Sequence, residues 1–156
     1  MTNNEIRVAD LMTRAVYTVT PTQSLPLAES LMRRLRVRHL PVVASDGRLV
    51  GIVSERDLLS AKISALAPLS DEERSTIQLA VPVSRVMEPN VWTIAPGALA
   101  VSAARIMREH RFGCLPVVER GRLVGVLSET DLLSLVTDAL ALTRPVRAER
   151  ERSPTI

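Results

Sequence analysis

The stretch LPVVASDGRLVGIVSERDLL, residues 40–59, recurs as LPVVERGRLVGVLSETDLL at residues 115–133. The two stretches differ in length by one residue, and the difference falls in the turn, where ASDGR is replaced by ERGR. A surface turn is where a real repeat tolerates a deletion. The match continues toward the N-terminus, because Val8–Pro21 resembles Val83–Pro96 at an offset of 75 residues. The chain therefore consists of two copies of one unit.

Each copy predicts the order strand, helix, strand, strand, helix. β-branched stretches at residues 16–19 and 91–94 predict the first strands, and the helix that follows has one apolar face. The predicted faces consist of Leu25, Ala28, Leu31, Met32 and Leu35 in the first copy, and Leu99, Ala103, Ile106, Met107 and His110 in the second. The predicted hairpins are His39–Val43 with Leu49–Val53, and Cys114–Val118 with Leu123–Leu127. The second helices begin after Ser54 and Ser128.

The hairpin strands are apolar at nearly every position, which is typical of strands that are buried on both faces. We therefore expect an α+β fold in which helices and the other copy cover each sheet. Between the copies, LSDEERSTIQLA predicts a helix that begins after Ser70, with acidic residues in its first turn. The predicted boundaries are an N-terminal segment 1–7, repeat one 8–62, a linker 63–82, repeat two 83–141 and a disordered tail 142–156.

Composition limits the classes of function. The net charge is only +3, and the arginines of the tail contribute much of it, so the folded part does not resemble a nucleic-acid-binding protein. The tail interleaves glutamates with these arginines, so we do not expect nucleic-acid binding there either. The single cysteine, Cys114, excludes an internal disulfide and a zinc site built on cysteines. We expect a cytoplasmic protein, because no signal peptide and no run of about 20 apolar residues is present.

The repeated pattern LPVV, GRLVG and S-E-x-D-LL resembles the cystathionine-β-synthase (CBS) domain. The resemblance covers roughly residues 8–61 and 83–135 and implies a tandem pair, or Bateman module, packed about a pseudo-twofold axis. It also implies a homodimer and ligand clefts between the copies. The implied ligands are AMP, ADP, ATP or S-adenosylmethionine, which act as regulators, and no cofactor or metal is expected.

Asp57 and Asp131 follow the serines at the two strand-to-helix junctions, Ser54 and Ser128. Each serine fits a helix cap, whereas an aspartate fits the reciprocal position of a capping box less well than glutamate. A carboxylate can instead accept hydrogen bonds from both hydroxyls of a ribose. The resemblance gives Asp57 and Asp131 this role.

The resemblance assembles two composite sites from both copies. The more basic one joins Ala95 with Arg38, His39, Ser54, Arg56 and Asp57. The other, nearly uncharged, joins Thr20 with Gly113, Cys114, Ser128, Thr130 and Asp131. Because arginine pairs with phosphate, we expect the basic site to prefer the more phosphorylated ligand.

Three classes of function remain in view. No Gly-rich phosphate loop or catalytic His, Cys and acid constellation is present, so we do not expect an enzyme. The leading hypothesis is a stand-alone regulatory module that senses adenosine nucleotides as a measure of cellular energy and acts on a separate protein partner. The alternative is a constitutive interaction or dimerisation module with non-functional clefts, which the small, uncharged Gly113, Cys114 and Ala95 favour.

Overall fold

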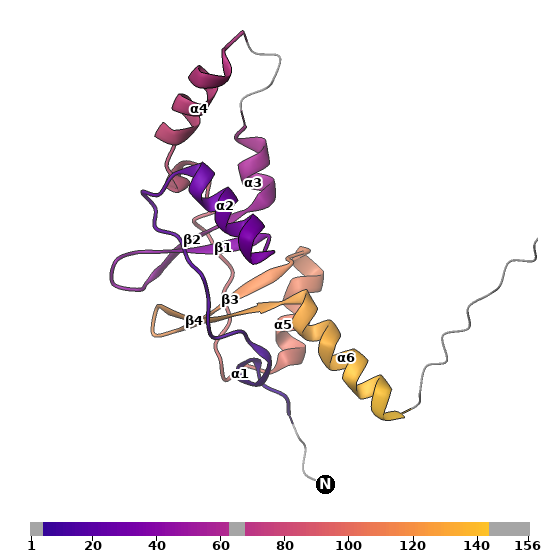
Figure 1. The fold of residues 1–156 in the computed structure, drawn as a ribbon. Helices are drawn as coiled ribbons and strands as arrows, with labels where there is room; N and C mark the ends of the chain where they lie inside the picture. The colour runs from indigo at the N-terminus through magenta and orange to yellow at the C-terminus, as the bar shows by residue number, and fades with distance from the viewer. Residues whose placement is uncertain (1–4, 63–67, 144–156) are drawn as a thin grey trace, which may run out of the picture.

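The computed structural model describes residues 5–62 and 68–143. Two antiparallel hairpins lie at the centre, and helices flank them (Figure 1). The first repeat contains α1 Val8–Leu11, α2 Leu25–Leu35, β1 His39–Val43, β2 Leu49–Ser54 and α3 Glu55–Ser60. The linker helix is α4 Asp71–Ala80, and the second repeat contains the 3-10 turn η1 Val83–Arg85, α5 Ala100–His110, β3 Cys114–Glu119, β4 Arg122–Ser128 and α6 Glu129–Thr143. The α+β fold with two repeats is confirmed.

The two repeats are related by a pseudo-twofold arrangement. The two hairpins meet at their turns, where Leu49 N donates to Gly121 O and Leu123 N donates to Gly47 O, both at 3.3 Å. Both turn glycines have positive φ, 82° at Gly47 and 78° at Gly121, which favours glycine at these positions. The two hydrogen bonds at the turns are therefore equivalent, one from each repeat.

The first predicted strand of each copy is reduced to a single bridge. Val19 pairs in parallel with Val42 of β1, and Ile94 pairs with Val117 of β3. Extending the first bridge would require N–H donors at Pro41 and at Pro21, which proline lacks. Pro116 and Pro96 have the same effect in the second copy. The β-branched residues do mark the extended segments that pair with β1 and β3. Prolines in each segment and in its partner strand prevent a longer ladder of hydrogen bonds.

The predicted helices are present, with one difference at their apolar faces. Leu25, Ala28 and Met32 are buried on α2, and Ala103 and Met107 are buried at the matching places on α5. His110 is exposed, so its predicted place on the apolar face is wrong.

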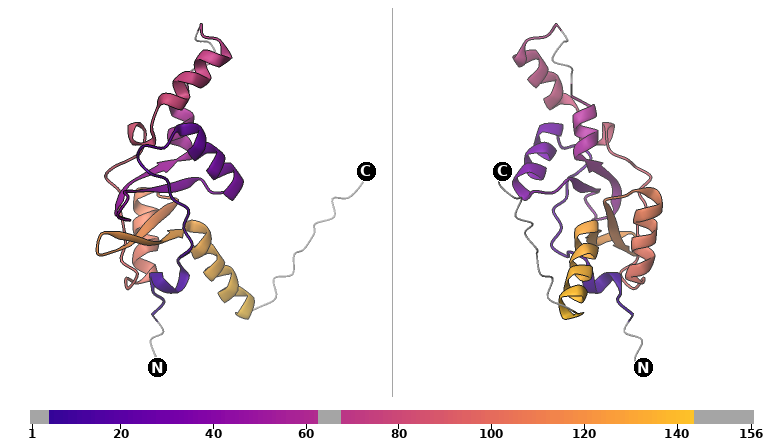
Figure 2. Two further views of the ribbon diagram at one scale, coloured as in Figure 1. Left: turned by 60° about the vertical axis from the view of Figure 1, so that its left-hand side comes forward. Right: turned by 90° about the vertical axis from the view of Figure 1, so that its right-hand side faces the viewer.

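The linker helix begins as predicted, because Ser70 Oγ accepts from Glu73 N at 3.2 Å and Glu73 Oε2 accepts from Ser70 N at 2.7 Å. None of its residues is buried. Helices α4 and α6 project from opposite ends of the molecule (Figure 2). Helix α6 extends two residues into the predicted tail, because leucine and alanine favour the helix to its end. The rest of the predicted tail lies outside the described residues.

Each repeat completes the hydrophobic core of the other. Val8 and Met12 pack with α5, β3 and β4, whereas Val83 packs with α2, β1 and β2. The backbone reinforces the exchange, since Val8 N donates to Ala98 O at 2.9 Å and Val83 N donates to Gln23 O at 2.8 Å. Neither core is complete without a segment of the other repeat, so the two repeats fold as one unit.

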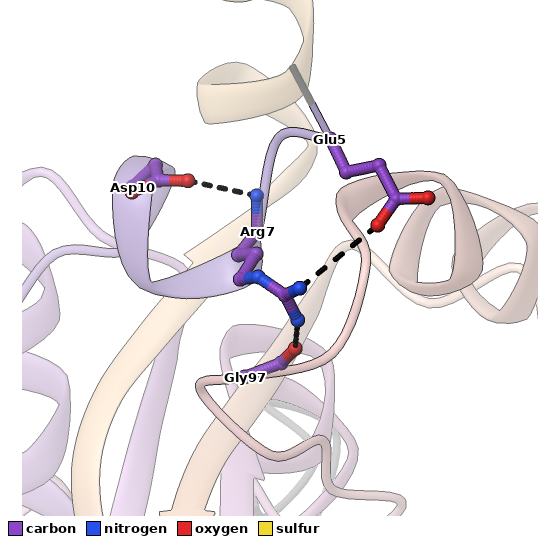
Figure 3. Close-up of polar contacts among 4 residues, drawn as sticks. All are labelled: Glu5, Arg7, Asp10 and Gly97. Carbon is purple, nitrogen blue, oxygen red and sulfur yellow. Dashed lines mark hydrogen bonds and ion pairs between the residues drawn. The ribbon is translucent and has the colours of Figure 1, made fainter. Parts of the chain in front are cut away.

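Polar contacts fix the exchanged N-terminal segment (Figure 3). Arg7 Nη1 donates to Gly97 O at 2.6 Å, and Arg7 Nη2 lies 3.9 Å from Glu5 Oε2. Asp10 Oδ2 accepts from the backbone nitrogen of Arg7 at 2.8 Å, which closes the first turn of α1. The bond from Arg7 to Gly97 joins residues that are 90 positions apart in the chain, whereas the other two contacts are local.

Two buried glycines allow the exchanged segments to approach the sheets. A Cβ atom at Gly51 would lie 2.6 Å from Met87 Sδ, and one at Gly125 would lie 2.7 Å from Met12 Sδ. After each methionine the chain pairs with a central strand, because Ile52 exchanges two backbone hydrogen bonds with Glu88 and Val126 exchanges two with Thr13. The chain after η1 is thereby held beside the end of β2.

Candidate nucleotide-binding cleft

Asp57 lies at the N-terminus of α3, directly after buried strand β2. Its Oδ2 accepts from Ser54 N and from Ser54 Oγ, both at 2.7 Å, while Asp57 N donates to Ser54 Oγ at 3.2 Å. Asp131 and Ser128 repeat this geometry at 2.7, 2.7 and 3.3 Å. The expectation that aspartate is a poor capping-box partner is therefore wrong, because the serine hydroxyl compensates for the shorter side chain by donating to the same oxygen.

The cap uses one carboxylate oxygen and leaves the other available. Asp57 Oδ1 accepts no hydrogen bond from the described residues, and the side chain is half-buried. A carboxylate held rigidly by one oxygen presents its second oxygen in a fixed direction. The structural and the binding interpretations of Asp57 are therefore compatible.

The Asp57 cleft, as we call it, consists of two adjoining cavities between the repeats. The inner cavity has a volume of about 490 Å³ and is lined by His39, Ile52, Ser54, Asp57, Glu88, Asn90, Val91, Trp92, Arg111, Phe112, Gly113 and Cys114. The outer cavity has a volume of about 450 Å³ and is lined by Arg38, His39, Ser54, Glu55, Arg56, Arg111, Gly113 and Glu129. His39, Ser54, Arg111 and Gly113 line both cavities, so the cleft is continuous.

The middle of the cleft is formed by the two hairpin entries. A Cβ atom at Gly113 would lie 3.3 Å from His39 Cε1, so a side chain at position 113 would crowd the imidazole. Burial lowers the pKa of His39, and the neighbouring Arg38 lowers it further, while Asp57 and Glu129 act in the opposite direction. His39 is therefore neutral at pH 7 and can serve as donor or acceptor.

Cys114 lines the inner cavity together with His39. Burial raises the pKa of its thiol to about 12, so the thiolate is scarce at pH 7. Such a thiol is suited to packing as a small side chain rather than to nucleophilic chemistry.

Aromatic side chains form one wall of the inner cavity. Trp92 and Phe112 line it, and the exposed ring of His110 lies 4.3 Å from the Trp92 ring and 5.3 Å from the Phe112 ring, measured between centroids. We did not predict these residues as site residues. The signal was present in the composition, because Trp92 and Phe112 are two of only three aromatic residues in the chain.

The structure brings together most of the predicted basic site, but not all of it. Arg38, His39, Ser54, Arg56 and Asp57 line the cleft, and they are joined by Gly113 and Cys114, which were predicted for the other site. Thr20 and Ala95 line neither cavity, whereas Asn90, Val91 and Trp92, just before Ala95, do.

The remaining predicted residues lie at the pseudo-equivalent junction. Ser128 and Asp131 form the cap of α6, and Thr130 is exposed on its first turn. Thr13 lies beside Val126 there, as Glu88 lies beside Ile52 in the Asp57 cleft. The second junction therefore has the same backbone frame with different side chains.

Comparison with known proteins identifies the repeat. The family model described as CBS domain matches residues 8–64 and again residues 83–138. The chain belongs to the CBS-domain family. A CBS domain-containing protein of Dictyostelium discoideum is 34% identical over 142 residues, which cover 90% of this chain and 98% of that protein.

Solved CBS-pair structures share the fold. CBSX2 from Arabidopsis thaliana, solved in complex with AMP, is 30% identical with a TM-score of 0.71, covering 89% of this chain and 99% of that one. The cytosolic domain of the Mg²⁺ channel MgtE, solved in complex with ATP, is 28% identical with a TM-score of 0.67, covering 85% of this chain and 49% of that one.

Some relatives are longer proteins. A homoserine O-acetyltransferase of Methanococcoides burtonii is 33% identical over 130 residues, but the chain spans only 24% of its length. Across residues 5–62 and 68–143 of the present chain, no cluster of His, Cys, Asp or Glu could hold a metal ion. Within the same ranges no helix is long and apolar enough to cross a membrane.

Proposed function

We propose that this CBS pair is a non-catalytic regulatory module that binds an adenine nucleotide in the Asp57 cleft. The observation that carries the proposal is the composition of the cleft. One end offers a carboxylate oxygen beside an aromatic wall, and the other end offers Arg38, Arg56 and Arg111. A nucleoside needs the first kind of surface and a phosphate needs the second. CBSX2 and MgtE, with their AMP and ATP, support the choice of ligand.

Each predicted residue then has a role in the proposal. Asp57 holds the ribose hydroxyls, and Trp92 and Phe112 contact the base. Arg38, His39 and Arg56 meet the phosphates, while Ser54 orients Asp57. Gly113 and Cys114 leave room at the centre. Thr20, Ser128, Thr130 and Asp131 would form a second cleft of lower phosphate affinity, and Ala95 supports the loop that carries Trp92.

A thermal-shift screen with AMP, ADP, ATP and S-adenosylmethionine tests the proposal, with GTP and NAD as comparison ligands. A ligand at 100 times its Kd adds about 2.7 kcal/mol to the stability of the folded state, or several degrees for a chain of this size. We expect Asp57→Asn to reduce the shift by about half or more at the same ligand concentration, because a tenfold loss of affinity leaves the ligand at about 10 times its Kd. This variant keeps one oxygen for the cap. Absence of any adenosine-dependent shift at millimolar ligand would refute the proposal.

A constitutive interaction module is the second candidate, and one observation favours it. The cap explains the presence of both aspartates without any ligand. The two candidates differ in the screen, because a constitutive module shows no ligand-dependent shift with either the wild-type protein or Asp57→Asn.

We also propose a homodimer that acts on a separate protein partner. Leu133 and Val136 of α6 are 63% and 52% exposed, and a helix with apolar residues on several sides is normally covered. One chain has a mass of 17.1 kDa, and light scattering after size exclusion should give twice that mass. A monomer at every concentration would contradict this.

The same proposal places the protein in the cytoplasm, where adenine nucleotides are abundant and the unpaired thiol of Cys114 is compatible with reducing conditions. Fractionation of cells that carry a tagged full chain tests this location. Recovery with the membrane or the secreted fraction would contradict it.

A further inference from the structure

A basic groove adjoins the Asp57 cleft on the surface between α2 and α3. This outer groove has a volume of about 590 Å³, and its apolar floor includes Met32, Val37 and Leu58. Five basic side chains line it against two acidic ones. The basic residues are Arg33, Arg36, Arg38, Arg56 and Lys62, and the acidic residues are Glu29 and Glu55.

The positive charge of the outer groove is largely uncompensated. Lys62 Nζ is bound to Glu29 Oε1 at 2.7 Å, which neutralises one of the five bases. The guanidinium groups of the four arginines form no ion pair or hydrogen bond with any group in residues 5–62 and 68–143. Like charges that are gathered around one concave surface raise the local concentration of anions.

The outer groove and the Asp57 cleft form one continuous path. Arg38, Glu55 and Arg56 line both the outer groove and the outer cavity of the cleft. A ligand held at Asp57 by its sugar would therefore extend its phosphates past Arg38 and Arg56 and then toward Arg33 and Arg36.

The second repeat shows that the fold does not require this charge. The positions of Arg38, Arg56 and Lys62 are occupied there by Gly113, Thr130 and Val136, whereas the positions of Arg33 and Arg36 keep arginine, as Arg108 and Arg111. The second repeat thus has two of the five basic residues. The side chains that connect the outer groove to the cleft, Arg38 and Arg56, are basic only in the first repeat.

We propose that the outer groove binds the distal phosphates of an adenosine polyphosphate whose nucleoside occupies the Asp57 cleft. This inference rests on the proposed function and names its ligand class, an adenosine compound with three or more consecutive phosphates. Arg33 and Arg36 are the residues that distinguish long phosphate chains from AMP, and Arg38 and Arg56 contact the proximal phosphates.

Calorimetric titration of the full chain with AMP, ADP, ATP and adenosine 5′-tetraphosphate, in buffer free of Mg²⁺, tests the inference. Exposed ion pairs are weak, so we expect affinity to rise about threefold per added phosphate, and the affinity for longer chains to fall more steeply with salt. The double variant Arg33→Gln/Arg36→Gln should weaken tetraphosphate binding about fivefold and leave AMP binding unchanged.

The matched control is Arg105→Gln/Arg108→Gln, which removes the same charge from α5, outside the outer groove and the cleft. It should leave the whole series unchanged. If AMP binds but affinity is flat along the series, or if both double variants weaken the tetraphosphate equally, the outer groove has no such role while the proposed function stands. If no adenosine ligand binds, the proposed function fails and this inference fails with it.

Discussion

The two repeats have nearly the same backbone but place different chemistry on it. Both contain a capped helix after a buried strand, with Asp57 and Asp131 held by the same three hydrogen bonds. At the hairpin entry, Arg38 and His39 of the first repeat correspond to Gly113 and Cys114 of the second. The repeated backbone therefore fixes where the ligand groups can lie, and a few substitutions decide what each place can bind.

We expect the largest effects on stability at Gly51 and Gly125, the two glycines against which Met87 and Met12 pack. Gly51→Ala and Gly125→Ala should each lower the free energy of unfolding by about 1–3 kcal/mol, because each adds a methyl group to a filled space. Gly125→Ala should be slightly the more damaging, since a backbone oxygen cannot move aside easily and Thr13 O lies 3.0 Å from the new atom, against 3.2 Å for Glu88 O at Gly51.

Urea denaturation measures both variants, with Gly97→Ala as the control because nothing lies within 4 Å of its added Cβ. A loss at Gly97 as large as at Gly51 and Gly125 would show that the core exchange is not the cause.

The capping serines should have equal effects if the two junctions are equivalent. Ser54→Ala and Ser128→Ala should each cost about 1 kcal/mol of unfolding free energy, because each removes the hydroxyl that binds the following aspartate. Thermal or urea denaturation of the two variants checks this. Unequal losses would indicate that α3 and α6 depend on their caps to different degrees.

The aromatic wall distinguishes the two clefts. Trp92→Leu should weaken AMP binding by about 0.5–1.5 kcal/mol, the usual worth of an aromatic contact, whereas Tyr17→Leu at the corresponding position should not affect the Asp57 cleft. Calorimetry gives the affinities, and Trp92 is the only tryptophan, so its fluorescence reports ligand binding directly. An unchanged affinity in Trp92→Leu would show that the base of the nucleotide does not contact the aromatic wall.

The smallest expected effect concerns pH, because acidic groups partly offset the lowered pKa of His39. The unfolded chain takes up a proton on His39 near its ordinary value of 6.5, whereas the folded protein does so only at lower pH. The stability associated with His39 is therefore complete above pH 6.5 and decreases as the pH falls below it. Denaturation across this range should show a weaker decrease for His39→Gln than for the wild-type protein; equal decreases would contradict it.

Much of the architecture could be predicted from the sequence because the signals are local. The repeat, the hairpins, the Ser70 cap and most buried positions of α2 and α5 follow from periodicity and turn residues. The short first strands could not be predicted from β-branched residues alone, since the limit comes from prolines on both the strand and its partner. The core exchange was also missed, because the packing of Val8 against the second repeat depends on three-dimensional topology.

The candidate site was predictable where it follows the repeated motif. Asp57, Ser54 and Arg38 are in or beside that motif, and all line the cleft. Trp92 and Phe112 were missed because they occupy positions where the two copies differ, and the motif contains no information about them. The loop that faces Asp57 was placed a few residues too late, at Ala95, since the pairing of Ile52 with Glu88 brings an earlier segment to the cleft.

The most direct test of the central claim is a calorimetric titration of ATP into the wild-type protein, Asp57→Asn and Asp131→Asn. The structure-based account predicts that Asp57→Asn weakens the tighter binding event about tenfold or more, because a hydrogen bond to a charged group is lost, while Asp131→Asn leaves that event intact. Equal weakening by the two substitutions, or tight binding that survives Asp57→Asn, would contradict the assignment of the nucleotide to the Asp57 cleft.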